Sequence, residues 1–301
     1  MRLNLYQYTI AVMVMLWSSL VDDALARQAP ASQEVNLNTP VSKFEKPEPT
    51  GPVLHLDREA KIRSLTAATA PVGVETIIGA DNRMRIINTT AFPARAVALI
   101  TFDGSRCTGW LYGPDVIATA GHCVHTGGSE GRWRTNVLVY PGRNGSSSPY
   151  GSCTAKRLHS VVGWTQNRDE RYDYGVIKLD CSIGNRTGWF KLWSQSTSLN
   201  GIPTTINGYP SDKPLEQWNS IDQVRKTKAK QVFYQNDTVA AMSGSPVFAN
   251  RPAGSPFCTG YCVIGIHAYG LHDTDSHSAN NHGTRLTQEV INNLITWRNA
   301  H

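Results

Sequence analysis

Short hydrophobic runs separated by turn residues dominate the chain from residue 77 onward. Typical runs are AVALITF at 96–102, DVIATAG at 115–121 and CVIGIHAYG at 262–270, with glycine, proline, asparagine or aspartate between successive runs. Regularly spaced short strands without intervening helices predict an antiparallel β-sandwich or β-barrel. One strong helical pattern stands at the end, at 286–300. Its apolar residues share one face by their spacing, and they are Val290, Ile291, Leu294, Ile295 and Trp297.

The N-terminus has the pattern of an export signal. Arg2 precedes an apolar stretch at 8–21, and ALA at 24–26 offers a small-residue cleavage site. We therefore predict a signal peptide over residues 1–26 and secretion of the mature protein. A membrane anchor is the alternative, but the apolar run is short for a span, and we expect no stable membrane association.

Residues 27–75 differ in composition from the rest of the chain. They are rich in proline, alanine, threonine and charged residues, and they contain no cysteine, tryptophan or tyrosine. A stretch such as KFEKPEPTGP at 43–52 cannot bury a core. We interpret residues 27–75 as a propeptide, with a retained disordered spacer as the alternative.

Composition sets broad limits on function. The chain has 301 residues, 40% of them hydrophobic and 17% charged, which is ordinary for a globular protein. The formal net charge of +6 permits an acidic partner. No basic run is interleaved with stacking aromatic residues, so we expect no nucleic-acid partner.

Six cysteines in an exported chain predict disulfides, and six cysteines allow fifteen pairings. They show no zinc-binding spacing, and they are Cys107, Cys123, Cys153, Cys181, Cys258 and Cys262. Four N-x-S/T sequons are candidate glycosylation sites, at Asn88, Asn144, Asn185 and Asn236.

Three motifs together carry chemistry. His122 stands at the end of an apolar run, Asp173 stands at the start of another, and MSGSP follows at 242–246. A lone histidine is most often structural. However, His, Asp and Ser in this order are one known arrangement of a serine-nucleophile triad. Acyl transfer needs a hydroxyl, a base that reaches it and a carboxylate that orients the base.

The motifs TAGHC, DYGVIKL and SGSPVF resemble those of the chymotrypsin-fold serine peptidases. Further stretches, such as CTGWLYGPDVIATAGHC, INGYPSDK and GTRLTQEV, make residues 76–299 similar to the bacterial and fungal glutamyl endopeptidases. The resemblance implies an all-β protein of two six-stranded antiparallel β-barrels and a C-terminal helix. The first barrel would span 76–195 and the second 196–301.

The resemblance also assigns roles to residues. It implies that His122 is the general base, Asp173 the orienting carboxylate and Ser243 the nucleophile, while Ser245 is scaffold. The backbone N–H groups of Ala241 and Ser243 would form the oxyanion hole. Relatives carry glycine at the Ala241 position, so alanine costs energy there if the backbone needs positive φ. Met242 cannot pair with a new N-terminal amine, which argues against a trypsin-type activation switch.

Substrate preference follows from the same resemblance. Glutamyl endopeptidases bind the substrate carboxylate with a histidine, a threonine and the mature N-terminal amine, which His267, Thr238 and Thr76 match here. The mature chain would then begin after cleavage of the Glu75–Thr76 bond. Asp237 supports a rival interpretation, because trypsins hold an aspartate that selects arginine and lysine at this distance before the nucleophile. His267 facing a lysine would be wasted or repulsive, so we expect cleavage after glutamate and more weakly after aspartate.

The resemblance pairs Cys107 with Cys123 and Cys258 with Cys262. The remaining pair, Cys153 and Cys181, would form a third bridge that is not a strong feature of the family. The loop HDTDSHSANNH at 272–282 gathers histidines and aspartates that suggest a metal site, namely His272, Asp273, Asp275, His277 and His282. Polar turn-rich loops commonly have this composition, and the triad needs no metal, so we expect neither metal nor cofactor.

The sequence therefore predicts a secreted serine endopeptidase, made as a precursor, that acts as a monomer on protein or peptide substrates. A trypsin-like or broad-specificity peptidase that uses Asp237 is one alternative. The other is an inactive homologue that serves as a binding module, which the Ala241 substitution leaves open.

Overall fold

The computed structural model describes residues 35–45, 66–67, 75–273 and 275–300. Contacts divide the chain into a unit of Met1–Val35 and a unit of Asn36–His301. The predicted signal peptide and most of the predicted propeptide lie outside the described residues, and the following description concerns the second unit. Within the described ranges, no helix is long and apolar enough to cross a membrane.

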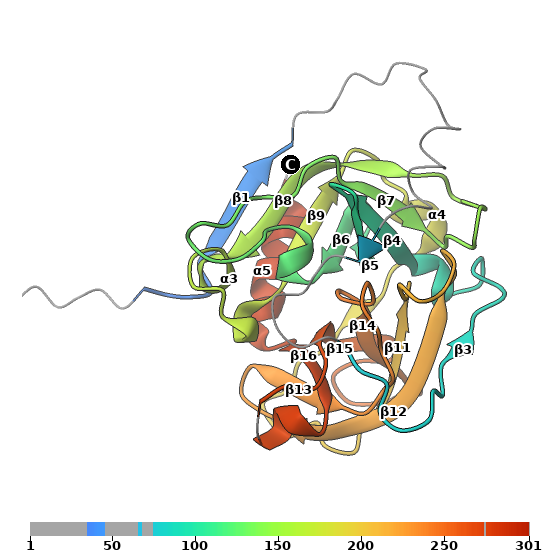
Figure 1. Ribbon diagram of the computed structural model, residues 1–301, viewed down its shortest axis with the longest axis vertical. Coiled ribbons are helices and arrows are strands. Elements are labelled where there is room, and N and C mark those ends of the chain that lie inside the picture. The colour runs from blue at the N-terminus through green and yellow to red at the C-terminus, as the bar shows by residue number, and fades with distance from the viewer. Residues whose placement is uncertain (1–34, 46–65, 68–74, 274, 301) are drawn as a thin grey trace, which may run out of the picture. The chain divides into compact units, whose positions relative to one another are not determined.

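Six antiparallel strands form the first barrel (Figure 1). They follow the order β8-β7-β4-β5-β6-β9, and pairing of β8 with β9 closes the ring. Their bounds are Val97–Phe102 for β4, Ser105–Gly113 for β5, Val116–Thr119 for β6, Leu138–Pro141 for β7, Cys153–Val161 for β8 and Gly175–Leu179 for β9. Every residue of β4, β6 and β9 is buried. These apolar runs thus become the core instead of a half-exposed sheet.

The second barrel repeats this plan. Its strands follow the order β15-β14-β11-β12-β13-β16, and β15 pairs with β16 to close it. Their bounds are Pro203–Gly208 for β11, Trp218–Thr227 for β12, Gln231–Tyr234 for β13, Pro246–Arg251 for β14, Gly260–Tyr269 for β15 and Asn281–Arg285 for β16. The two closed six-stranded barrels confirm the predicted fold class.

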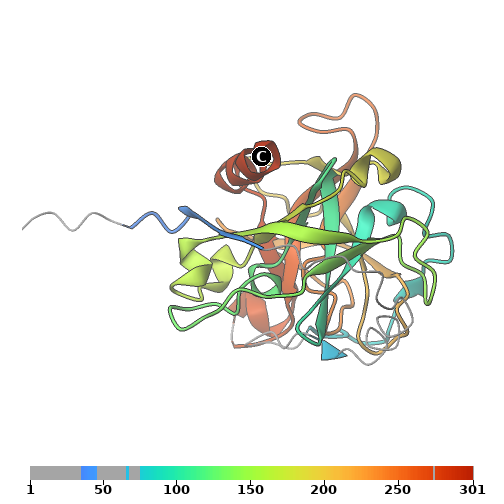
Figure 2. The same cartoon turned by 90° about the horizontal axis from the view of Figure 1, so that it is seen from above.

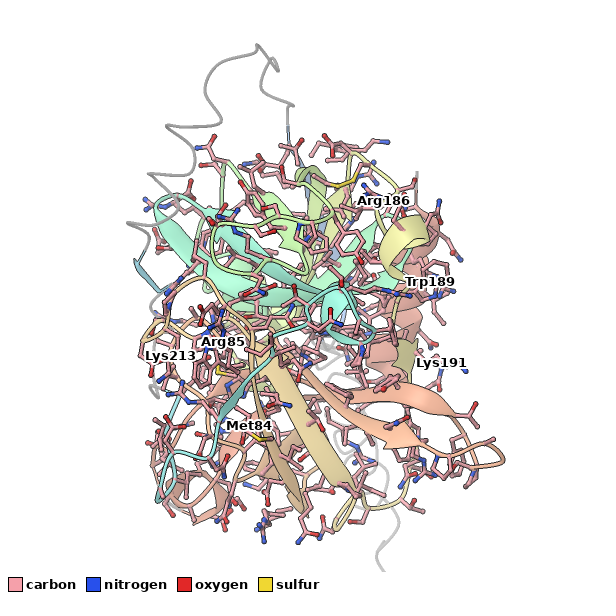
Figure 3. All side chains as sticks on the ribbon, turned by 90° about the vertical axis from the view of Figure 1, so that its right-hand side faces the viewer. Met84, Arg85, Arg186, Trp189, Lys191 and Lys213 are labelled. Atoms are coloured by element: carbon pink, nitrogen blue, oxygen red, sulfur yellow. A yellow bond between two sulfur atoms is a disulfide. The ribbon has the colours of Figure 1, made fainter. Side chains whose placement is uncertain are left out.

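Each barrel also receives an element from the opposite part of the chain. β3 (Met84–Arg85) precedes the first barrel in sequence but pairs with β12 of the second, and its side chains are labelled in Figure 3. Helix α5 (Gln288–Asn299) follows the second barrel but packs on the first. There, Tyr112 donates its hydroxyl to the Leu294 carbonyl at 3.1 Å, and Trp297 stacks on His159. Figure 2 shows α5, in red, outside the strands.

Shorter elements connect the strands. They are the helices η2 (Ala94–Ala96), η3 (Gly121–Cys123), α3 (Val162–Thr165), η4 (Glu170–Tyr172), α4 (Gly184–Thr187) and η5 (Asp275–Ser278), with strand β10 (Lys191–Leu192). The connection from α4 to β10 joins the two barrels, and Arg186, Trp189 and Lys191 mark it in Figure 3.

Helix α5 begins where the sequence predicts and buries most of the predicted face. The Thr287 side chain accepts a hydrogen bond from the Val290 N–H and caps the first turn. Four of the five predicted apolar residues are buried, but Ile295 is exposed. The prediction for Ile295 was wrong because the helix rests on the row formed by Val290, Leu294 and Trp297, and Ile295 lies at the edge of that row.

Part of the predicted propeptide is folded onto the first barrel. β1 (Pro40–Phe44) pairs antiparallel with β8, and β2 (Thr66–Ala67) pairs parallel with β5. β7 covers only Cys153 and Thr154 of β8, so the edge from Arg157 to Val161 is open to β1. None of the β1 side chains is fully buried, which is why the hydrophobic pattern did not predict this strand.

Candidate active site

His122 and Asp173 meet where two paired strands of the first barrel end. β6 and β9 are antiparallel neighbours, so η3 after β6 and η4 before β9 lie at the same end. Asp173 Oδ1 accepts a hydrogen bond from the His122 backbone N–H, and Oδ2 lies 2.8 Å from His122 Nδ1. A carboxylate only accepts, so it holds a proton on Nδ1 and leaves the lone pair of the neutral ring on Nε2. Among the described residues, Nε2 has no hydrogen-bond partner.

The second barrel also contacts Asp173. Tyr269 on β15 donates its hydroxyl to Asp173 Oδ2, and Thr284 on β16 donates to the Asp173 carbonyl at 3.1 Å. Burial, with Asp173 adding to it, raises the pKa of Tyr269 well above its usual value, so its phenol stays a donor. The motifs did not mark Tyr269. The pairing of β15 with β16 shifts register between His267 and Tyr269, so the spacing along the strand alone does not predict where the Tyr269 side chain lies.

Ser243 lies in a tight turn between two residues whose backbone conformation is left-handed. Ala241 has φ 76° and Gly244 has φ 88°. A Cβ on Gly244 would lie 2.1 Å from the Thr108 carbonyl oxygen, so only glycine fits there. The Thr108 N–H donates to the Ser243 carbonyl at 2.9 Å, so the first barrel braces the turn. Ala241 does adopt the positive φ that alanine disfavours, at a cost of about 1–2 kcal/mol.

Met242 points into the second barrel. It is fully buried in the core that includes Val224, Tyr234 and Val247. The apolar side chain that breaks the usual motif therefore anchors the turn on which Ser243 stands.

The carboxyl group of Glu75 lies against Ser243. Ser243 Oγ donates a short hydrogen bond to Glu75 Oε1, and the Ser243 backbone N–H donates to the same carboxyl. His267 Nε2 lies 3.5 Å from Oε1. Burial raises the pKa of Glu75 to about 8, although the bonds from Ser243 act in the opposite direction. In this state the Ser243 hydroxyl bonds to the last residue of the predicted propeptide.

His267 is held in one tautomer by Tyr234, which lies 2.8 Å from its Nδ1. Burial keeps the pKa of Tyr234 well above its usual value, so the phenol donates to Nδ1. The proton of the neutral ring then sits on Nε2 and faces Glu75. Burial also lowers the pKa of His267 to about 3, so this contact joins a neutral imidazole to a buried carboxyl. The sequence did not indicate Tyr234.

Thr76 lies beside Thr238, which brings two of the predicted specificity residues together. The Thr238 N–H donates to the Thr76 carbonyl at 3.4 Å. Asn281 holds Thr76 from the other side, because it accepts from the Thr76 N–H at 3.2 Å and donates to its carbonyl at 2.6 Å. Thr238 is fully buried, and within the described part of the chain its hydroxyl has no hydrogen-bond partner.

Asp237, the rival specificity residue, is fully buried and already engaged. Its two carboxylate oxygens accept hydrogen bonds from the backbone N–H groups of Ile78 and Asn82, at 2.7 and 2.9 Å. Asp237 thus fastens the segment after Thr76 to the second barrel.

Three disulfides brace the fold in the expected pairs. Cys107–Cys123 ties β5 to η3 next to His122, and the other bridges are Cys153–Cys181 and Cys258–Cys262. The structure does not favour the predicted glycosylation site at Asn236. Its side chain is fully buried and hydrogen-bonded to Thr204 and Ser220, so a glycan has no room there. Asn88 and Asn185 are exposed and Asn144 is half-buried, and glycosylation at these three stays a prediction.

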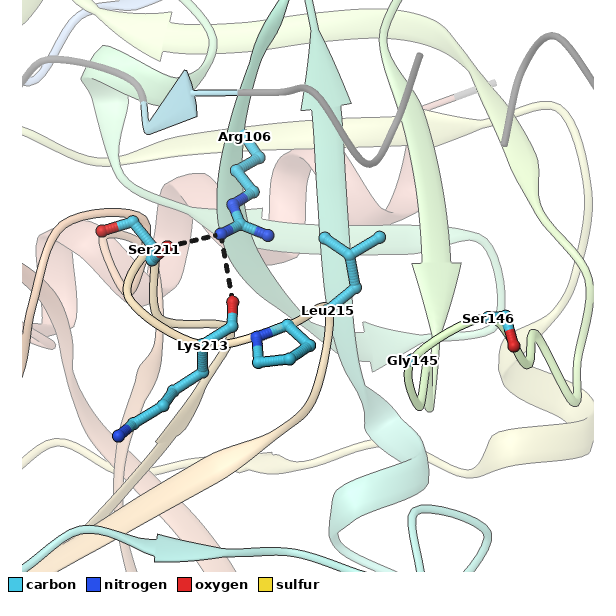
Figure 4. A pocket seen from close by; sticks show the side chains of 7 residues that line it. Arg106, Gly145, Ser146, Ser211, Lys213 and Leu215 are labelled. Carbon is cyan, nitrogen blue, oxygen red and sulfur yellow. Dashed lines mark hydrogen bonds between the residues drawn. The ribbon is translucent and has the colours of Figure 1, made fainter. Parts of the chain in front are cut away.

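A surface pocket of about 560 Å³ lies elsewhere, and none of the triad residues lines it (Figure 4). Arg106 on β5 donates to the carbonyls of Ser211 and Lys213 there, at 3.0 and 3.4 Å. Its guanidinium therefore holds the loop between β11 and β12.

Comparisons with known proteins agree with the two-barrel fold. The family model described as Trypsin matches residues 86–291. The chain is 39% identical over 252 residues to a glutamyl endopeptidase of Bacillus licheniformis, covering 83% of this chain and 77% of the relative. It is 38% identical over 232 residues to a Bacillus subtilis protein named extracellular metalloprotease, covering 74% and 70%. A solved structure titled Glu endopeptidase in complex with MPD matches with a TM-score of 0.66 and 30% identity, over 75% of this chain and 100% of that one.

Two closed barrels and the family model together define the class. The chain belongs to the trypsin family of chymotrypsin-fold serine peptidases. Within this class, the identity to the Bacillus licheniformis relative and the structural match make it a serine endopeptidase of the glutamyl endopeptidase type.

Proposed function

We propose that this chain is a secreted endopeptidase that cleaves after glutamate, and more weakly after aspartate, with His122, Asp173 and Ser243 as catalytic residues. The main support is the position of the Glu75 carboxyl. A buried carboxyl is costly unless it is hydrogen-bonded. The site beside Ser243 and His267 already accommodates one. Three disulfides and the N-terminal pattern support secretion.

The mechanism starts once Glu75 leaves and the Ser243 hydroxyl is free. His122 Nε2 takes the hydroxyl proton as Ser243 Oγ attacks the substrate carbonyl. Asp173 stabilises the resulting imidazolium, and the N–H groups of Ala241 and Ser243 stabilise the oxyanion. His122 then gives the proton to the leaving amine. A water molecule, activated by the same histidine, hydrolyses the acyl-enzyme and restores Ser243.

Activation would follow hydrolysis of the Glu75–Thr76 bond. Water adds across this bond and leaves a carboxylate on Glu75 and a new amine on Thr76. Because Asn281 and Thr238 already hold Thr76, the new amine would stay beside Asn281 Oδ1. This positive amine, the Thr238 hydroxyl and His267 are the groups that would bind a substrate carboxylate.

The contacts of Asp237 favour glutamate over arginine and lysine. A basic substrate side chain would have to compete with the N–H groups of Ile78 and Asn82 for this carboxylate. The complete His122–Asp173 pair argues against an inactive homologue. The name of the Bacillus subtilis relative indicates metal-dependent proteolysis, but here side chains supply nucleophile, base and orienting carboxylate. A fluorophosphonate probe that labels Ser243 would identify an active serine enzyme.

A peptide library digested with the processed enzyme tests the proposed specificity. We expect cleavage mainly after glutamate. His267→Ala should lower the preference for glutamate while Ser243 still reacts with the probe, because this change removes a carboxylate contact and leaves the catalytic residues. Predominant cleavage after arginine or lysine would overturn the proposal and favour a pocket built on Asp237.

A further inference from the structure

Three histidines and one glutamate converge where the two barrels meet, apart from the proposed catalytic residues. Glu170 belongs to η4 of the first barrel, and the histidines belong to the second barrel and its loops. We call Glu170, His272, His277 and His282 the His/Glu cluster. One nitrogen or oxygen atom from each lies within 4.8 Å of the others. The three histidines are close in sequence, whereas Glu170 lies about 100 residues earlier and only the fold brings it to them.

The distances from Glu170 to the three imidazoles are close to those between neighbouring ligands of a metal ion. His272 Nε2 lies 3.1 Å from one Glu170 oxygen, and the Nε2 atoms of His277 and His282 lie 3.3 and 3.7 Å from the other. Zinc binds imidazole nitrogen and carboxylate oxygen at about 2.0–2.2 Å in a tetrahedron. Neighbouring ligand atoms are then about 3.3–3.6 Å apart, as simple geometry requires of such bond lengths.

The hydrogen bonding of the cluster leaves places for a cation. His272 Nδ1 lies 3.3 Å from the Gly270 carbonyl, which can only accept, so the proton of the neutral ring sits on Nδ1. The Nε2 lone pair of this neutral ring then faces a Glu170 oxygen, where a bound cation would satisfy both acceptors. Within the described residues, the buried Nε2 atom of His277 also has no hydrogen-bond partner.

The cluster is enclosed but still reachable. The His282 side chain is fully buried, whereas 16% of the His277 side chain and 29% of the Glu170 side chain are exposed. An ion can therefore enter from the Glu170 side. Three imidazoles favour zinc and similar transition metals over calcium or magnesium, which prefer oxygen ligands.

We infer that the His/Glu cluster binds one zinc ion, or a similar divalent transition metal, through Glu170, His272, His277 and His282. Four protein ligands form a closed site, which is typical of structural zinc. The ion would fasten η4 to β16, and Asp173 follows η4 directly. His282 also stacks on Tyr269 at 5.2 Å. A metal here would thus hold the two barrels together beside the orienting carboxylate, and the inference does not rest on the proposed specificity.

The test uses the full chain with Ser243→Ala, to prevent self-digestion, and without a polyhistidine tag. Metal analysis after zinc loading and gel filtration should find about one ion per chain, as a single four-ligand site requires. Zinc should raise the thermal unfolding temperature, and a chelator should reverse the shift. Cobalt in place of zinc should give the intense visible absorption of a tetrahedral site.

Variants locate the ion. Glu170→Gln and His277→Ala should each weaken zinc binding at least about 10–100-fold, the loss seen when even outer partners of ligands are removed. Asp275→Asn is the matched control, because Asp275 lies in the same loop but pairs with Lys226 and Lys228. It should bind zinc like the parent. Failure to bind zinc, or equal binding by Glu170→Gln, would overturn the inference. Because glutamine keeps the shape of glutamate, this variant tests the site even if His277→Ala misfolds.

Discussion

The two barrels differ in whether their proposed catalytic side chains are free to react. In the first barrel, the His122–Asp173 pair is complete, because Asp173 binds both the backbone and the ring of His122. In the second, Ser243 is in place, but its hydroxyl and N–H are bonded to Glu75. If the proposed roles hold, the precursor would be controlled at Ser243 and its pocket rather than at His122.

The difference has a structural origin. The base and its carboxylate stand at the ends of paired strands, next to a disulfide. The nucleophile stands in a turn that needs two positive φ angles and has a buried propeptide residue against it. The strand ends hold His122 and Asp173 in contact in this state. Under the proposed function, the Ser243 hydroxyl becomes available only after the Glu75–Thr76 bond is cleaved and Glu75 leaves.

The largest predicted effect separates the two serines of the turn. Ser243→Ala should lower kcat by about 10⁴–10⁶-fold, as loss of the nucleophile does in serine peptidases. Ser245→Ala should have little effect, because Ser245 contacts the β15 strand through its backbone carbonyl. Steady-state kinetics on the processed enzyme decide between them, and a reversed result would mean that Ser243 is not the nucleophile.

Disruption of the His122–Asp173 pair in the first barrel should have the second-largest effect on turnover. Asp173→Asn presents an amide donor to His122 Nδ1 and so favours the wrong tautomer, which should lower kcat by about 10⁴-fold. Asparagine keeps the shape of aspartate, so circular dichroism of the variant should match that of the parent. Near-normal turnover would show that Asp173 does not orient the base.

Tyr269→Phe tests the support that the second barrel gives to this pair. Loss of one hydrogen bond to a charged group should lower kcat/KM by about 10-fold. Without the phenol, Asp173 Oδ2 keeps the His122 ring but loses its second donor, so turnover should fall while KM changes little. A purely structural role for Tyr269 would lower the unfolding temperature and leave kcat unchanged.

The contact between Glu75 and Ser243 should depend on pH. Burial raises the pKa of Glu75 from about 4.5 to about 8. A raised pKa means that this contact stabilises the closed precursor fully below about 4.5 and is lost as pH rises through about 8. Fluorophosphonate labelling of the purified precursor should therefore speed up over this range. Glu75→Gln removes this titration, so its labelling rate should lack the rise that Glu75 causes, and an identical profile in both proteins would contradict the assignment.

The smallest effect concerns the strain at the turn. Ala241→Gly should raise the free energy of unfolding by up to about 1 kcal/mol, because glycine adopts positive φ without steric cost but loses more chain entropy. Gly244→Ala is the contrasting variant and should be strongly destabilising, since its Cβ would meet the Thr108 carbonyl at 2.1 Å. Denaturant unfolding measures the free energy of unfolding of both variants. A lower free energy of unfolding for Ala241→Gly would show that the positive φ of Ala241 causes no strain that glycine can relieve.

The sequence predicted the fold well because strand runs, turn residues and the family motifs all agree. The motifs also mark two pairs that the structure places in contact with a common partner or with each other: His122 contacts Asp173, and Ser243 and His267 both contact Glu75. The sequence could not predict Tyr234 or Glu170, because their roles depend on pairings between distant segments. It also missed β1, which pairs through backbone groups that leave no mark on the side-chain pattern.

The exchange of β3 and α5 between the barrels has a consequence for how the protein unfolds and how readily it is digested. Because β3 pairs with the second barrel and α5 packs on the first, neither barrel can open far without releasing an element that the other needs. Such cross-bracing favours loss of structure in a single cooperative transition over local opening. Local opening is what exposes a chain to proteolysis, so the exchange of β3 and α5 would protect a peptidase from digestion by its own copies.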